Sequence, residues 1–170
     1  MSIATRTALL LIDFQVWIMR DLIGAGGPAA AAAAALILAA ARRRSDLVVH
    51  VRYLRIDGSD GGAESAQARF VGEIGVLACD TVVTKYGISV FDGTDLHTML
   101  TRAQVGRLVL AGVATESAIE ETANSAIDLG YEVQVISDAV AGASPETHGA
   151  ALERMRDSGV ALHTVGAAAG

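Results

Sequence analysis

The stretch R-L-V-L-A-G-V-A-T-E-S-A-I-E-E-T-A-N-S-A-I-D-L-G-Y, from Arg107 to Tyr131, predicts a buried strand, a tight turn and a helix. Its apolar beginning, L-V-L-A, is typical of a parallel strand that is covered on both faces. Gly112 allows a sharp turn, and Thr115 or Glu116 can cap the helix. Such a unit aims backbone N–H groups at one point, which favours an anion or a developing oxyanion. Many α/β proteins contain such a turn without any chemistry.

On both sides of this unit the chain alternates apolar runs with helical segments. Strands are predicted at 8–12, 47–53, 81–84, 108–111, 132–137 and 160–164. Helices are predicted at 29–41, 64–75, 95–102, from 115 or 116 to 129, and at 145–157. Thr94 is the predicted N-cap of helix 95–102 and Ser144 that of helix 145–157, and Gly130 ends the helix before it. Residues 14–28 and 55–65 are expected to be loops, and 166–170 a frayed tail. The alternation predicts one α/β domain over residues 1–170, with a parallel sheet between two layers of helices.

Composition excludes several classes of function. A net charge of −6 gives no electrostatic support for a nucleic-acid partner. The single cysteine, Cys79, allows no internal disulfide, so a cytoplasmic location is expected. No signal peptide is recognised at the N-terminus. The alanine-rich segment 29–41 is too short and too weakly apolar for a bilayer span, so no membrane partner is expected. Neither a P-loop nor a dinucleotide fingerprint is present.

Two charged residues stand at the ends of apolar strands. Asp13 follows the first strand and Lys85 the third. Asp is a common turn or cap residue and Lys is common on surfaces, so each alone has an ordinary structural interpretation. Ligands bind outside the carboxyl ends of the strands in open α/β sheets, where these two residues could pair. A paired carboxylate beside a fixed cation can move a proton. Phe14 and Trp17 follow Asp13 and could line a pocket, although Trp17 could equally be a core or dimer-contact residue.

The order of three motifs resembles the isochorismatase-like hydrolases. They are A-L-L-L-I-D-F-Q at 8–15, T-K-Y-G-I-S-V-F-D-G-T-D-L at 84–96, and A-G-V-A-T-E-S-A at 111–118. The later L-G-Y-E-V-Q-V-I-S-D-A-V also fits, so the resemblance covers nearly the whole chain. It implies a Rossmann-like three-layer α/β/α sandwich with a six-stranded parallel sheet. It also implies a homodimer or a higher homo-oligomer, and a small-molecule substrate.

Most members of this family are cysteine hydrolases of amides and related C–N bonds, with an Asp, Lys and Cys triad. The resemblance matches Asp13 and Lys85 to the first two. It puts Ala118 at the position of the nucleophilic cysteine, and a methyl group closes the thioester route. Cys79 precedes the third strand and cannot replace it. Ser117 is adjacent, but a shift of one residue rotates a helical side chain by about 100°.

Three explanations of Ala118 stay open. The chain could be a natural cysteine-less member, like those that cleave a vinyl ether with the aspartate as general acid. It could be an engineered Cys-to-Ala variant, or a binding or interaction protein that has lost catalysis.

We expect Phe14, Trp17, Val113, Ala114 and Ser117 to contact the substrate. The N–H groups around Ala114 and Ala118 would form an oxyanion site, with a cis peptide between Val113 and Ala114. The metal-binding branch has an Asp-x-His pattern after its second strand, where this chain reads V-R-Y-L-R-I-D-G-S, so no metal or other cofactor is expected.

Overall fold

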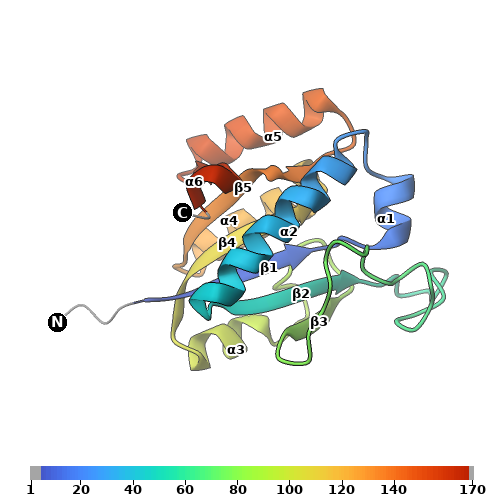
Figure 1. Ribbon diagram of the computed structural model, residues 1–170, viewed down its shortest axis with the longest axis horizontal. Helices are drawn as coiled ribbons and strands as arrows, with labels where there is room; N and C mark the ends of the chain where they lie inside the picture. The colour runs from blue at the N-terminus through green and yellow to red at the C-terminus, as the bar shows by residue number, and fades with distance from the viewer. Residues whose placement is uncertain (1–4, 169–170) are drawn as a thin grey trace.

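A computed structural model describes residues 5–168 as three layers, with one sheet between two groups of helices (Figure 1). In chain order the elements are β1 (Arg6–Ile12), α1 (Val16–Asp21), α2 (Gly27–Arg44), β2 (Leu47–Tyr53), β3 (Thr81–Lys85), α3 (Leu96–Arg102), β4 (Val105–Val113), the π-helix η1 (Thr115–Ile119), α4 (Glu120–Asp128), β5 (Glu132–Ala141), α5 (Pro145–Asp157), β6 (Ala161–His163) and α6 (Val165–Ala168). Within the described residues the sheet has six strands, and its neighbouring strands are parallel. The fold class expected from the sequence is confirmed.

The strand order is β3-β2-β1-β4-β5-β6. The chain moves outward from β1 to β3 and then returns to the other side of β1 with β4. The order therefore reverses between β1 and β4, which is where doubly wound sheets bind their ligands. Asp13 and Ala114 directly follow these two strands.

Two apolar clusters hold the layers together. Alternate β1 residues face opposite sides of the sheet, as the period of two in a strand requires. Leu9 and Leu11 pack with α1, α2 and Val165, whereas Leu10 and Ile12 pack with α3, α4 and Met155 of α5. Burial on both faces explains why β1 and β4 read as continuous apolar runs.

Gly112 is required where β4 meets the end of β1. Its φ of +145° is a conformation that residues with a side chain rarely adopt. A Cβ at this position would also collide with the carbonyl oxygen of Ile12. This close contact brings the residues after both strands to one point.

Several predicted boundaries were correct. Pro145–Asp157 is helical, and Ser144 and Thr147 form a reciprocal capping box at its start. Gly130 follows α4 with a φ of +87°, as expected for a residue that ends a helix. The second strand has the predicted bounds, and the fifth extends further, to Ala141.

Other local predictions were wrong. The expected loop 14–28 contains α1. The expected helix at 64–75 is absent, because its backbone bonds to the segment after β1: Val16 N–H donates to Arg69 and Val71 N–H to Phe14. Asp95 holds the N-cap position of α3 without a side-chain bond, and the Thr94 hydroxyl accepts a hydrogen bond from Leu96 N–H at 3.4 Å. The tail forms α6 up to Ala168, and residues 169–170 lie outside the described part of the chain.

Neither Thr115 nor Glu116 caps the central helix, because both lie inside its first turn. Thr115 Oγ1 is 2.8 Å from His148 Nδ1. Glu116 Oε1 accepts hydrogen bonds from Ala143 N–H at 2.8 Å and the Thr147 hydroxyl at 3.0 Å. Both side chains thus tie the turn after β4 to the start of α5.

No helix within residues 5–168 is long and apolar enough to cross a membrane.

Candidate active site

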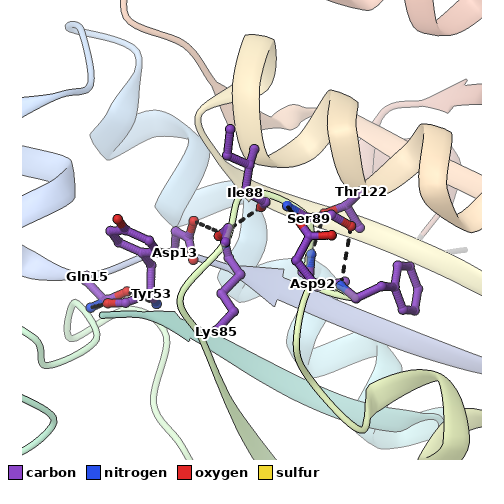
Figure 2. A network of polar contacts seen from close by, with 11 residues as sticks. Asp13, Gln15, Tyr53, Lys85, Ile88, Ser89, Asp92 and Thr122 are labelled. Carbon is purple, nitrogen blue, oxygen red and sulfur yellow. Dashed lines mark hydrogen bonds and ion pairs between the residues drawn. The ribbon is translucent and has the colours of Figure 1, made fainter. Parts of the chain in front are cut away.

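A buried ion pair forms the centre of the candidate site. Lys85 Nζ lies 2.9 Å from Asp13 Oδ2, and the two side chains are 2% and 7% exposed (Figure 2). Asp13 directly follows β1 with a φ of +59°, in the left-handed region that Asp tolerates better than most residues. Lys85 is the last residue of β3. The pairing predicted from two strand ends is therefore present in the structure.

The remaining donors of the Lys85 ammonium point to the loop after β3. Its Nζ donates to the carbonyl of Ile88 at 2.8 Å and to that of Gly87 at 3.2 Å. It also lies 5.3 Å from the centre of the Tyr53 ring, within range of a cation–π contact. With Asp13, these groups surround the cation and fix its position. Lys85 therefore has a fixed geometry at the end of the sheet rather than an ordinary surface position.

The loop that supplies these carbonyls is itself held in place. Asp92 Oδ2 accepts a hydrogen bond from Ser89 N–H at 3.0 Å, and the Thr122 hydroxyl accepts one from Val90 N–H at 3.2 Å (Figure 2). A Cβ on Gly87 would collide with the Asp92 side chain. These contacts link the position of Lys85 to α4, which carries Thr122.

Gln15 extends the pairing of β1 and β2 beyond their last residues. Its fully buried side chain donates to the Tyr53 carbonyl at 2.9 Å and accepts from the Tyr53 N–H at 2.7 Å. The carboxamide thus takes the place of a neighbouring strand. It fixes Tyr53, whose ring lies under Lys85. Gln15 was not predicted as a site residue, although it stands in the motif at 8–15.

Asp13 keeps one unused carboxyl oxygen. Oδ1 is buried and has no hydrogen-bond partner among the described residues. Burial raises the pKa of Asp13 to about 6, although the charge of Lys85 and the hydrogen bond to it act in the opposite direction. Asp13 can therefore give or accept a proton close to neutral pH.

A cavity of about 310 Å³ opens beside this pair. It is lined by Asp13, Trp17, Ile18, Leu22, Ile23, Tyr53, Lys85, Tyr86, Gly87, Ile88, Val113, Ala114, Ser117 and Ala118. Apart from the ion pair, most of its wall is apolar or aromatic, as is usual for small-molecule sites. The contributing residues come from the ends of β1 to β4, from α1 and from η1.

Most of the predicted site residues meet at this cavity. Ala118 is 4% exposed and lines the same cavity as Asp13, and Val113, Ala114 and Ser117 also lie in its wall. The predicted cis peptide joins Val113 to Ala114. Phe14 does not line the cavity, because it points into the core beside α2.

Two other polar residues lie apart from the site. Cys79 is exposed and precedes β3. Asp138 accepts a hydrogen bond from Val165 N–H at 2.9 Å, at the start of α6. Residues 5–168 contain no group of three or more His, Cys, Asp or Glu side chains that could hold a metal ion.

The wall residues from α1 could not be found by sequence reasoning. Ile18 was placed in a loop with Leu22 and Ile23, which follow α1, and a helix of six residues is too short for its apolar spacing to be recognised. Tyr86 had a usable signal, since it stands just after the end of a strand.

Comparison with known proteins identifies the family. The isochorismatase domain matches residues 7–167, and the chain belongs to this family. An uncharacterised isochorismatase family protein of Bacillus subtilis is 42% identical over 95 residues, which is 56% of this chain and 50% of that protein. A protein of Arabidopsis thaliana named as a probable inactive nicotinamidase is 40% identical over 87 residues, 51% of this chain and 44% of its own length. The matches thus span about half the length of these curated relatives.

Solved structures agree with the fold. The crystal structure of an isochorismatase family protein from Desulfovibrio vulgaris superposes with a TM-score of 0.84 at 30% identity, over 96% of each chain. The similarity therefore extends over the sheet, both helix layers and the strand ends that carry the site.

Proposed function

We propose that this chain is a hydrolase that acts on a small molecule at an amide or other C–N bond, or at a vinyl ether. The observation that carries the proposal is the buried pair of Asp13 and Lys85, which leaves one carboxyl oxygen of Asp13 without a partner in the cavity wall. Burying two charges in one place is costly. The positioning of a proton-transfer group for catalysis would explain why the fold retains this costly pair.

Asp13 is the proposed acid or base, and Lys85 the residue that orients it. With a pKa of about 6, part of Asp13 is protonated near neutral pH. The protonated form can deliver a proton to a vinyl ether, after which water adds to the resulting cation and the C–O bond breaks. The ionised form can take a proton from a thiol or from water that attacks a carbonyl. The protonation state therefore separates the two reaction classes.

The turn after β4 is the proposed oxyanion site. The N–H groups around Ala114 and Ala118 stand at the start of the continuous helical segment η1–α4, which is the positive end of its dipole. Charge that develops on a substrate oxygen beside this turn would be stabilised there. The links from Thr115 and Glu116 to the start of α5 hold the turn in position.

Residue 118 decides between the reaction classes. We propose that it occupies the family position of the nucleophilic cysteine, so amide hydrolysis needs a thiol that this chain lacks at that position. Vinyl-ether cleavage by Asp13 needs no such thiol. The test compares the chain with its Ala118→Cys variant on a panel of amides, lactams and isochorismate. Amide hydrolysis by the variant alone supports an ancestral or engineered loss of the cysteine.

Further outcomes of the same panel are equally informative. Cleavage of the vinyl ether by both proteins supports a cysteine-less enzyme. In either case Asp13→Asn should abolish turnover, since it removes proton transfer but keeps the shape. Ser117→Ala should leave turnover largely unchanged. Dependence on Ser117 with Asp13 dispensable would contradict the assignment and indicate a serine nucleophile.

A second candidate function is ligand binding without catalysis. Two observations favour it: residue 118 is alanine, and a similar Arabidopsis thaliana protein is named as a probable inactive nicotinamidase. Binding of panel compounds without turnover, even by Ala118→Cys, would support this alternative.

We also propose that the protein acts as a cytoplasmic homodimer or higher homo-oligomer. Apolar side chains stay exposed around the cavity mouth, where Leu22, Tyr86 and Ile88 are about half exposed. Burying such side chains between copies would be favourable. Sedimentation that shows only monomer at micromolar concentration would contradict this assembly.

A further inference from the structure

The indole N–H of Trp17 is a buried hydrogen-bond donor without a partner. Trp17 is 7% exposed, belongs to α1 and lines the cavity beside Asp13. Its Nε1 atom makes no hydrogen bond with any described residue. Indole nitrogen can only donate, and buried Trp side chains usually find an acceptor. This donor therefore calls for an acceptor from outside the chain.

None of the groups described beside the ring supplies that acceptor. The guanidinium of Arg55 lies over the ring, 4.7 Å from its centre, and carries only donors. The Tyr53 ring is tilted by 44° at a centre-to-centre distance of 6.3 Å and forms an aromatic contact. Ile18 of α1 and the residues that follow the helix in the cavity wall, Leu22 and Ile23, are apolar. The space where an acceptor can enter is the cavity itself.

A second unpartnered group lies in the same cavity. Asp13 Oδ1 is buried without a hydrogen bond, so the cavity wall holds one unused donor and one unused carboxyl oxygen. The remaining wall is mostly apolar. A ligand that satisfies both groups has two polar points separated by an apolar body.

We propose that Trp17 is a specificity-determining residue, and that its indole N–H binds a hydrogen-bond acceptor on the ligand at a point away from the group that meets Asp13. The ligand class is a small, flat or apolar molecule that carries an oxygen or nitrogen acceptor on its body. This assignment rests on the proposed function only in placing the reacting group at Asp13. Trp17 moves no proton, so it affects which ligand binds rather than the chemical step.

The experiment uses four probes of nearly equal shape: benzamide and pyridine-2-, pyridine-3- and pyridine-4-carboxamide. Each can place its carboxamide at Asp13, and the pyridines carry a ring nitrogen acceptor at three different positions. Titration calorimetry near neutral pH should show at least one pyridine binding about tenfold more tightly than benzamide, as expected for one buried hydrogen bond.

The matched variants separate the N–H group from the ring. Trp17→Phe keeps a flat aromatic ring but removes the N–H donor, so the preference should be lost and the ratio of pyridine affinity to benzamide affinity should fall to about one. Tyr86→Phe removes a hydroxyl from the same cavity wall and should keep that preference. A preference that persists in Trp17→Phe, or a chain that does not distinguish the probes or binds none of them, would overturn the proposal.

A measurement on the unaltered chain keeps the test valid if Trp17→Phe does not fold. Trp17 is the single tryptophan in the sequence, so its indole N–H gives one identifiable resonance in a ¹H–¹⁵N spectrum. The preferred pyridine should shift this resonance downfield and benzamide should not. Equal response to both would refute the contact.

The outcome is independent of turnover. A Trp17-dependent preference, with no hydrolysis of any probe or of the amides, lactams and isochorismate of the panel by this chain or by Ala118→Cys, would retain the binding proposal and reject the hydrolase. Hydrolysis without a Trp17-dependent preference among the probes would support the hydrolase and reject the binding proposal.

Discussion

The unfolding free energy of the Asp13→Asn variant, taken relative to that of the unaltered chain, should increase as the pH rises. Burial raises the pKa of Asp13 from 3.8 to about 6 in the folded state, and Lys85 offsets only part of this effect. The folded state therefore binds the proton more tightly than the unfolded state. The unaltered chain has this contribution in full below pH 3.8 and loses it as the pH rises through about 6.

The magnitude follows from the two pKa values. A difference of one pKa unit corresponds to about 1.4 kcal/mol, so the contribution lost is about 3 kcal/mol of unfolding free energy. Asparagine has nearly the same shape and does not titrate in this range. The stability of Asp13→Asn minus that of the unaltered chain should therefore rise by about 2.5 kcal/mol between about pH 4 and about pH 8, which is most of the full difference.

Urea unfolding followed by the fluorescence of Trp17, the single tryptophan, measures this difference at each pH. The control is Asp21→Asn on the surface, where the hydrogen bond from Arg20 lowers the pKa of the carboxyl. That lowered pKa gives stability that is present above pH 3.8 and lost on acidification below it. The control difference should therefore not rise between about pH 4 and about pH 8, and its slope should be of opposite sign at lower pH. A flat or falling difference for Asp13→Asn would refute the reasoning, because it would mean that Lys85 outweighs burial and keeps Asp13 ionised.

Three further substitutions probe the framework of the site. Gly112→Ala should cost at least about 2 kcal/mol of unfolding free energy, because it combines a φ of +145° with a collision at the Ile12 carbonyl. Its control is Gly149→Ala within α5, where a Cβ meets nothing, and which should stabilise by about 0.5–1 kcal/mol. Gln15→Leu should cost about 2–4 kcal/mol in urea unfolding, since it leaves the Tyr53 N–H and carbonyl without their partner; a cost below 1 kcal/mol would show that the pairing is dispensable. Asp80→Leu should cost about 3–5 kcal/mol and speed proteolysis within residues 54–80, because it removes the buried acceptor that Arg42 and His50 share; unchanged cleavage would contradict this anchoring role.

The fold could be predicted because its strands are buried on both faces. β1, β2 and β4 read as apolar runs whatever their neighbours are, and the alternation with helices then limits the topology to a parallel sheet. α1 could not be predicted, since its six residues are shorter than the window in which helical periodicity is visible. Residues 64–75 have a helix-like composition, but their backbone groups bond to the segment after β1.

The centre of the candidate site could be predicted from strand ends alone. Asp13 and Lys85 are neighbours because parallel strands end at one edge of the sheet, and this holds whatever the loops do. The direction in which a single side chain points could not be predicted. Phe14 follows Asp13 directly yet faces the core, and Gln15 next to it bonds to Tyr53. Such orientations depend on the left-handed turn at Asp13, which the sequence permits but does not require.

The π-helix after β4 limits which insertions and deletions the chain can tolerate in this region. A hydrogen bond from Ile119 N–H to the Ala114 carbonyl at 3.2 Å closes a turn that holds one residue more than an α-helical turn. Deleting one residue here would convert it to an ordinary turn and rotate residue 118 by about 100° relative to α4. That residue would then leave the cavity wall, and the apolar face of α4 would lose its match to the sheet. Insertions and deletions should therefore be tolerated in the loop 55–65 but not between β4 and α4.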